Sequence, residues 1–252
     1  MIYCLSQHHT GTWSTLAWIL KHQGVDGFLT SAHLFDILEP SEPDQESGVY
    51  PVHPMESGEL VEKFDPKLVF QEHMKLDPTK VNRIDRSQVL MCLMNPTVIP
   101  VRDPLASLIS YQVRAETDGR TPANGFAPRS HVDVWVALAQ TWKTILKDFG
   151  HVRFMPWDLL GKGDRFEVAE KLFGISTDLG LYDGKPSLTC ARNMIHNNDL
   201  GSYPLKEQYQ EGSLETIREG VSEGAVNLLI SKQKLIRPFL EFLGYADLMW
   251  WT

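Results

Sequence analysis

Short apolar runs alternate with amphipathic segments along the chain. Runs typical of buried strands occupy residues 1–5, 27–30, 67–71, 97–101 and 152–155. Apolar residues at helical spacing predict helices at residues 12–23, 87–94, 131–149 and 228–243. Strands separated by helices predict a three-layer α/β fold, in which helices flank a central parallel sheet and right-handed crossovers join its strands. Such sheets bind ligands in a crevice at the carboxyl ends of their strands.

Two stretches rich in chain-breaking residues interrupt this pattern. Residues 39–60 hold four prolines, and residues 117–129 hold two prolines and two glycines, so both are predicted to be loops. Loops of this length are usually functional, and we expect both to shape the acceptor side of a binding site. No internal repeat divides the chain, so residues 1–252 are expected to form a single domain.

Composition narrows the class of protein. Hydrophobic residues make up 42% of the chain, which is typical of a globular protein. The formal net charge of −8 argues against general binding to nucleic acid. The three cysteines are odd in number and far apart, which favours a reducing compartment over a disulfide framework. No apolar run approaches the roughly 18 residues of a membrane span, and no secretory signal pattern is present, so we expect a cytoplasmic protein with no membrane partner.

The most informative segment follows the apolar run at residues 97–101. Arg102 ends this run, Asp103 suits a helix N-cap, and Pro104 suits the first helical position. Ser110 follows eight residues after Arg102, on the same side of the predicted helix as Asp103 and Ser107. A guanidinium and a hydroxyl so placed are suited to holding one phosphate from two directions. The alternative is a surface Arg–Asp pair that caps an ordinary helix.

A second candidate phosphate site follows the first apolar run. The segment that joins this run to the predicted helix is rich in hydroxyls and contains one glycine: His9, Thr10, Gly11, Thr12, Trp13 and Ser14. Backbone N–H groups at a helix start favour an anion, and a glycine lets the backbone approach it closely. The lysine-containing Walker A pattern is missing from the sequence. The alternative is a helix capped by Thr10 or Thr12 without any ligand.

Together these two segments resemble the sulfotransferase family. Residues 152–175 and 236–245 also resemble that family's segments, so the resemblance extends over much of the chain. It implies a P-loop NTPase-like fold and 3′-phosphoadenosine 5′-phosphosulfate (PAPS) as the sulfuryl donor, with adenosine 3′,5′-bisphosphate (PAP) as product and no metal. It places the 5′-phosphosulfate on the loop of residues 9–14, and the 3′-phosphate on Arg102 and Ser110.

The sequence departs from the family pattern in the first loop. His9 stands where the family has a lysine or arginine, and Trp13 stands where it has a second threonine. A cation beside the bridging oxygen would help the leaving phosphate accept charge, and nearby phosphate would favour a protonated histidine. His9 is therefore expected to act as a catalytic cation. The alternative is that His8 and His9 are solvated loop residues.

A candidate general base lies at the end of the run at residues 67–71. Glu72 and His73 follow this run directly. Adjacent strand residues point to opposite faces of a sheet, so only one of them is expected to face the crevice. The resemblance favours His73, because the family has a histidine at this strand end. The alternative is a solvated cluster that includes Lys75.

These observations lead to one main hypothesis about function. We expect a sulfotransferase that moves a sulfuryl group from PAPS to a hydroxyl or amine of a small-molecule or glycan acceptor. Two alternatives stay open: a non-catalytic nucleotide-binding protein of the same fold, and a P-loop kinase. The sequence does not identify the acceptor or the oligomeric state.

Overall fold

A computed structural model describes the sheet and the main helices of the chain. The described residues are 2–7, 10, 12, 15, 27–30, 68–80, 82–117, 119, 128–156, 174–175, 177–179 and 223–245. The loop predicted at residues 39–60 lies outside them, as does most of the loop predicted at residues 117–129. Thr12 and Thr15, within the first predicted helix, are helical, and the rest of that helix also lies outside them.

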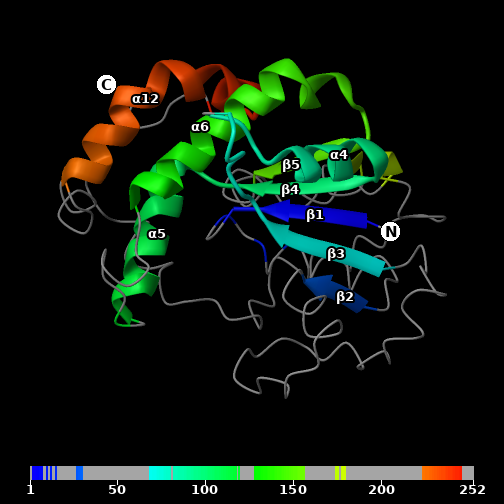
Figure 1. Ribbon diagram of the computed structural model, residues 1–252, viewed down its shortest axis with the longest axis horizontal. Coiled ribbons are helices and arrows are strands. Elements are labelled where there is room, and N and C mark those ends of the chain that lie inside the picture. Colours follow the sequence, from blue (N-terminus) through cyan, green and yellow to red (C-terminus); the bar gives the residue numbers. More distant parts are fainter. Residues whose placement is uncertain are drawn as a thin grey trace.

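Five parallel strands form one sheet in the order β2-β3-β1-β4-β5 (Figure 1). The strands are β1 (Ile2–Ser6), β2 (Gly27–Thr30), β3 (Leu68–His73), β4 (Thr97–Val101) and β5 (Val152–Pro156). Every residue of β1 and β4 is buried, as expected for central parallel strands covered on both faces. All five predicted strands are confirmed, although β3 extends two residues beyond its predicted end.

The order of the strands places a topological switch point between β1 and β4. β1 lies in the middle of the sheet, and the chain that follows it leads to β2 at one edge. The chain that follows β4 leads to β5 at the opposite edge. Connections that leave two neighbouring strands in opposite directions open a crevice at the carboxyl ends of those strands. The predicted phosphate-binding segments follow these two strands.

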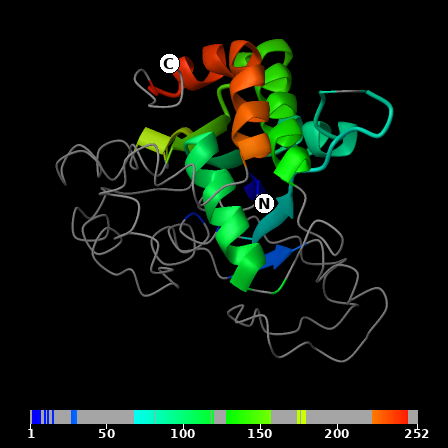
Figure 2. The same cartoon turned by 90° about the vertical axis from the view of Figure 1, so that its left-hand side faces the viewer.

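Four α-helices are described, and three of them lie on one side of the sheet. They are α4 (Arg86–Met94), α5 (Pro104–Thr117), α6 (Pro128–Thr144) and α12 (Glu223–Phe242). Figure 2 shows α4, α6 and α12 gathered on one side, while α5 lies in front of the strand ends. The helix predicted at residues 131–149 ends at Thr144 and is followed by a short 3₁₀ helix, Leu146–Asp148. The sheet and these helices confirm the predicted α/β class.

The core beneath these helices is dominated by aromatic and branched side chains. Trp135 of α6 and Phe239 of α12 are fully buried, with ring centroids 6.5 Å apart. Tyr3 and Leu5 of β1 belong to the same buried cluster. Burial of such large apolar surfaces is the main favourable term in folding, and it fixes the helices against β1. No helix in the described part of the chain is long and apolar enough to cross a membrane.

Candidate phosphate and base sites at the strand ends

The end of β4 has the predicted helix-capping geometry. Asp103 Oδ1 accepts hydrogen bonds from the backbone N–H groups of Leu105, at 2.7 Å, and Ala106, at 3.3 Å. Pro104 is the first residue of α5. Asp103 is therefore the N-cap that the sequence predicts, and its carboxylate satisfies two N–H groups that a helix start leaves unpaired.

Arg102 is half-buried between the end of β4 and the start of α5. No hydrogen bond or salt bridge joins its guanidinium to another described residue, so the Arg–Asp pair considered from the sequence does not form. Ser110 is buried at 6% exposure, roughly 9 Å further along the axis of α5 than Pro104. No hydrogen bond links Arg102 directly to Ser110 among the described residues.

The loop after β1 holds six predicted site residues, and the structure describes two of them. Thr10 is buried, and its Oγ1 donates a hydrogen bond to the backbone oxygen of Gln7 at 2.8 Å. Thr12 is also buried, and its Oγ1 has no hydrogen-bond partner among the described residues. His9, Gly11, Trp13 and Ser14 lie outside the described residues. Thr10 therefore stabilises the loop turn, whereas the buried hydroxyl of Thr12 makes no such bond.

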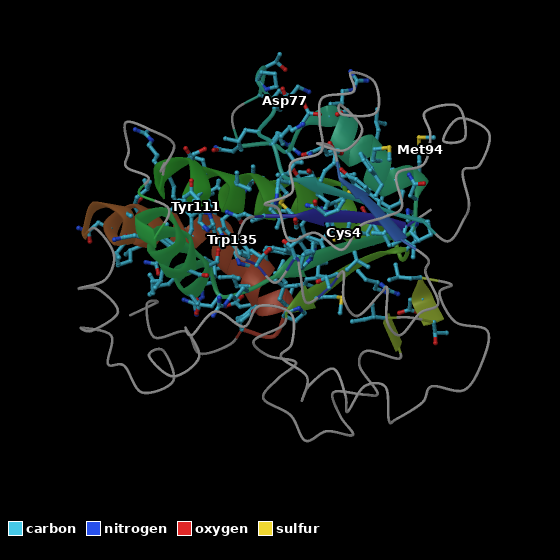
Figure 3. The ribbon with its side chains drawn as sticks, turned by 90° about the horizontal axis from the view of Figure 1, so that it is seen from below. Cys4, Asp77, Met94, Tyr111 and Trp135 are labelled. Atoms are coloured by element: carbon cyan, nitrogen blue, oxygen red, sulfur yellow. The ribbon has the colours of Figure 1, made fainter. Side chains whose placement is uncertain are left out.

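A buried hydrogen-bond network joins the end of β1 to α5 and α6. Gln7 Nε2 donates to the backbone oxygen of His131 at 2.7 Å, and His131 Nε2 lies 2.6 Å from Ser107 Oγ. The His131 ring stacks on Tyr111, with ring centroids 5.0 Å apart. Trp135 Nε1 donates to the same Ser107 hydroxyl at 3.5 Å. Figure 3 labels Tyr111 of α5 and Trp135 of α6, two residues that contact this network.

Sequence reasoning missed this network. His131 is predicted only as the start of an amphipathic helix, and Gln7 is not singled out. One signal was present: Gln7 directly follows a buried strand, and a polar residue at a buried position is almost always hydrogen-bonded. Gln7 Oε1 is also buried and has no hydrogen-bond partner in the described part of the chain. The network links the first candidate phosphate loop to the helix of Ser110.

Glu72 and His73 point to opposite faces of the sheet, as their adjacent positions predict. Glu72 Oε2 accepts a hydrogen bond from the Tyr3 hydroxyl at 2.8 Å, on the face of β3 that packs against the core. Burial, and then the charge of Glu72, raise the pKa of Tyr3 well above its usual range. Lys75 Nζ lies 3.8 Å from the other carboxylate oxygen. Glu72 is thus engaged by two partners.

His73 lies on the other face, beside the end of β1. Its Nδ1 is 3.3 Å from Ser6 Oγ, and its backbone oxygen accepts a hydrogen bond from Gln88 Nε2 at 2.8 Å. β1 and β3 are paired so that Ser6 lies opposite His73. The candidate base therefore lies one strand away from the switch point between β1 and β4.

No family model and no curated protein sequence matches the chain. One solved structure that matches is the mouse sulfotransferase SULT7A1 in complex with PAP. The match has a TM-score of 0.49 and 14% sequence identity, and it covers 98% of this chain and 85% of that protein. The described part of the chain has a five-stranded parallel sheet with α-helices packed on one side of it.

Proposed function

We propose that the protein is a sulfotransferase that transfers a sulfuryl group from PAPS to a hydroxyl or amine of a small-molecule or glycan acceptor. The observation that carries the proposal is the shared position of the two candidate phosphate segments. They follow β1 and β4, which are neighbours at the switch point, and the bonds through Gln7, His131 and Ser107 join them. A doubly phosphorylated nucleotide is the ligand class that two such segments fit.

In this proposal each end of the donor has its own group of residues. The loop after β1 holds the 5′-phosphosulfate through backbone N–H groups and the hydroxyl of Thr12, with Thr10, Gly11, Trp13 and Ser14 in the same loop. His9 supplies positive charge to the leaving phosphate. Arg102 and Ser110 hold the 3′-phosphate through a charge-assisted fork and a hydroxyl.

The transfer step needs positioning and one proton acceptor. Like phosphoryl transfer, sulfuryl transfer passes in line through a loose transition state, so alignment and charge stabilisation supply most of the rate. The acceptor hydroxyl or amine must also lose its proton. We assign this role to His73, because Glu72 is on the opposite face and accepts a hydrogen bond from Tyr3.

The 3′-phosphate assignment is tested by calorimetry with adenosine 3′,5′-bisphosphate. Arg102→Ala and Ser110→Ala are each expected to weaken binding by about 1–3 kcal/mol, or roughly five- to 150-fold in Kd, because each removes a charge-assisted bond to phosphate. Adenosine 5′-monophosphate lacks the 3′-phosphate, so its affinity is expected to stay unchanged in both variants.

Two variants on α12 are matched controls for this measurement. Arg237→Ala removes a guanidinium that pairs with Glu241 on the exposed side of α12, and Ser231→Ala removes an exposed hydroxyl. Both are expected to bind the bisphosphate like the wild type. Unchanged bisphosphate affinity in the Arg102 and Ser110 variants would contradict the 3′-phosphate site.

The replacement of the family's loop lysine or arginine by His9 favours a second candidate function. Without a fixed cation at the leaving phosphate, the chain would bind the nucleotide and not transfer the sulfuryl group. A transfer assay with sulfur-labelled PAPS separates the two candidates. Labelled acceptor, or labelled sulfate released at an enzyme-dependent rate, supports the sulfotransferase. Bisphosphate binding with neither product supports the binding protein.

A further inference from the structure

Gln7 and Thr12, at the two ends of the loop after β1, each have a buried side-chain atom without a hydrogen-bond partner. Gln7 is 3% exposed and Thr12 is 9% exposed. In the described part of the chain, the buried side-chain atoms that lack a partner are Gln7 Oε1, Thr12 Oγ1 and Trp142 Nε1. Two of them belong to the loop that is proposed to hold the 5′-phosphosulfate. Because buried polar groups are costly when unpaired, this clustering indicates a group that the protein does not itself supply.

Another buried glutamine shows how this fold pairs such an amide. Gln88 of α4 is 1% exposed. Its Oε1 accepts a hydrogen bond from the backbone N–H of Lys75 at 2.8 Å, and its Nε2 donates to the backbone oxygen of His73 at 2.8 Å. Both atoms of the Gln88 amide are therefore paired within the protein. Gln7 is paired only at Nε2, which donates to the backbone oxygen of His131 at 2.7 Å.

The orientation of the Gln7 amide is fixed by the group that it contacts. The backbone oxygen of His131 only accepts, so the amide nitrogen must face it, and exchanging the nitrogen and oxygen would bring two acceptors together. Oε1 is therefore turned away from that oxygen. It accepts hydrogen bonds and cannot donate one, so its missing partner carries an N–H or O–H group. An ionised phosphate oxygen also only accepts, and it does not fit Oε1.

Gln7 lies between the two candidate phosphate segments. Its backbone oxygen accepts a hydrogen bond from Thr10 in the loop after β1. Its side chain is joined through His131 to Ser107 of α5, the helix that also contains Ser110. Because β1 and β4 are neighbours, the crevice of the switch point opens beside this residue. A ligand with one phosphate on each segment would place the group that joins its phosphates next to Gln7.

We infer that Gln7 Oε1 accepts a hydrogen bond from the 2′-hydroxyl of the bound nucleotide, so that Gln7 selects a ribonucleotide over a 2′-deoxyribonucleotide. The inference rests on the nucleotide-binding part of the proposed function. In PAPS and in PAP the sugar joins the two phosphates, and its 2′-hydroxyl is the only sugar hydroxyl that carries no phosphate. That hydroxyl has one hydrogen to donate, as Gln7 Oε1 requires.

The two unpaired atoms of the loop then contact different parts of one ligand. Thr12 Oγ1 donates to the 5′-phosphosulfate, while Gln7 Oε1 accepts from the sugar beside it. The amino group of adenine also donates, but it is at the edge of the base farthest from both phosphates. A buried water on Gln7 Oε1 is the alternative that the experiment separates, because water would pair with this oxygen whichever sugar is bound.

Calorimetry with PAP and with 2′-deoxyadenosine 3′,5′-bisphosphate measures the contribution of the 2′-hydroxyl. The intact wild-type chain is expected to bind the deoxynucleotide about three- to tenfold more weakly, because one buried hydrogen bond is lost. Gln7→Met has a side chain of similar length that has no amide to donate or accept. In this variant the ratio of the two affinities is expected to fall to about one, even where the lost bond to His131 weakens both.

Gln88→Met is the matched control, because it removes a buried glutamine amide whose two atoms are both paired within the protein. It is expected to retain the wild-type ratio. A crystal structure of the wild-type chain with PAP is an independent measurement that does not depend on the folding of a variant. It is expected to place the 2′-oxygen about 2.5–3.0 Å from Gln7 Oε1. A water on Oε1, with the 2′-hydroxyl elsewhere, overturns the inference.

The outcomes separate this inference from the proposed function. Equal wild-type affinities for the two nucleotides overturn the inference and leave the sulfotransferase proposal standing. A preference for PAP that persists in folded Gln7→Met also overturns it, because another residue then holds the 2′-hydroxyl. The expected ratios without sulfuryl transfer to any acceptor support the inference and count against the sulfotransferase. If neither nucleotide binds, both are wrong.

Discussion

The two faces of the β1–β3 strand pair use their polar side chains in different ways. On the face that packs against the helices, Tyr3 and Phe70 stack within the core, and Glu72 accepts a hydrogen bond from the Tyr3 hydroxyl. On the opposite face, Ser6 and Gln71 form a polar cluster around His73. Glu72 and His73 are adjacent in sequence, yet they have different partners.

The difference shows how a strand can give two adjacent titratable residues different surroundings. One partner of Glu72 is a buried phenol that donates a hydrogen bond to it, so this carboxylate helps to satisfy the core. His73 Nδ1 lies beside the Ser6 hydroxyl, a group that can both donate and accept. We therefore expect substitutions on the two faces to affect different properties of the protein.

The largest expected effect is on turnover when His73 is replaced. His73→Ala is expected to lower kcat by about 10²- to 10⁴-fold, because it removes the proposed general base, and to leave bisphosphate affinity nearly unchanged. Steady-state transfer kinetics and calorimetry measure the two quantities separately.

Glu72→Gln is the matched variant on the other face. It retains a side-chain oxygen that can accept the Tyr3 hydroxyl, so turnover is expected to change little. The expected difference between the two faces is contradicted if His73→Ala transfers sulfuryl groups at the wild-type rate, or if Glu72→Gln loses more turnover than His73→Ala. Either result would assign the base to Glu72 or to another residue.

The next effect is on stability and arises on the core face. Tyr3→Phe removes the hydroxyl that donates to Glu72 Oε2 and leaves a mostly buried carboxylate oxygen without that donor. The free energy of unfolding is expected to fall by about 1–2 kcal/mol, as urea denaturation would measure it. Glu72→Gln keeps an acceptor and is expected to lose less. Equal denaturation midpoints for Tyr3→Phe and the wild type would show that this bond contributes nothing.

Local sequence signals predicted the elements that depend on local chemistry. The N-cap role of Asp103 follows from the Asp-Pro pair at a helix start, and the hydrogen bonds to Leu105 and Ala106 confirm it. The opposite orientation of Glu72 and His73 follows from strand alternation alone. Both rules concern neighbours in sequence, so no knowledge of the packing was needed.

The network of Gln7, His131 and Ser107 could not be predicted in the same way. These residues are more than 20 positions apart in sequence, and their contact depends on how α5 and α6 pack beside the end of β1. Hydrophobic periodicity predicts that a helix has a buried face, but not which strand end that face meets. The same limit applies to Ser6, whose contacts with His73 depend on the register between β1 and β3.

The smallest expected effect is on the reactivity of two buried cysteines, which lie on opposite faces of the sheet. Cys4 precedes Ser6 by two residues in β1, on the face of the polar cluster, whereas Cys92 of α4 belongs to the core cluster on the other face. Burial raises the pKa of both thiols to about 12. Only the thiolate reacts, and at pH 8 a thiol with this pKa is ionised about once in ten thousand molecules.

Neither Cys4 nor Cys92 is therefore expected to react with iodoacetamide in the native protein at pH 8, and peptide mass spectrometry would locate any label. The urea-unfolded chain, in which both react, is the positive control. Faster labelling of Cys4 than of Cys92 would show that the face of the polar cluster opens to solvent below Ser6. Since water would then compete for the hydrogen bonds of the polar cluster, such opening would weaken the distinction between the two faces.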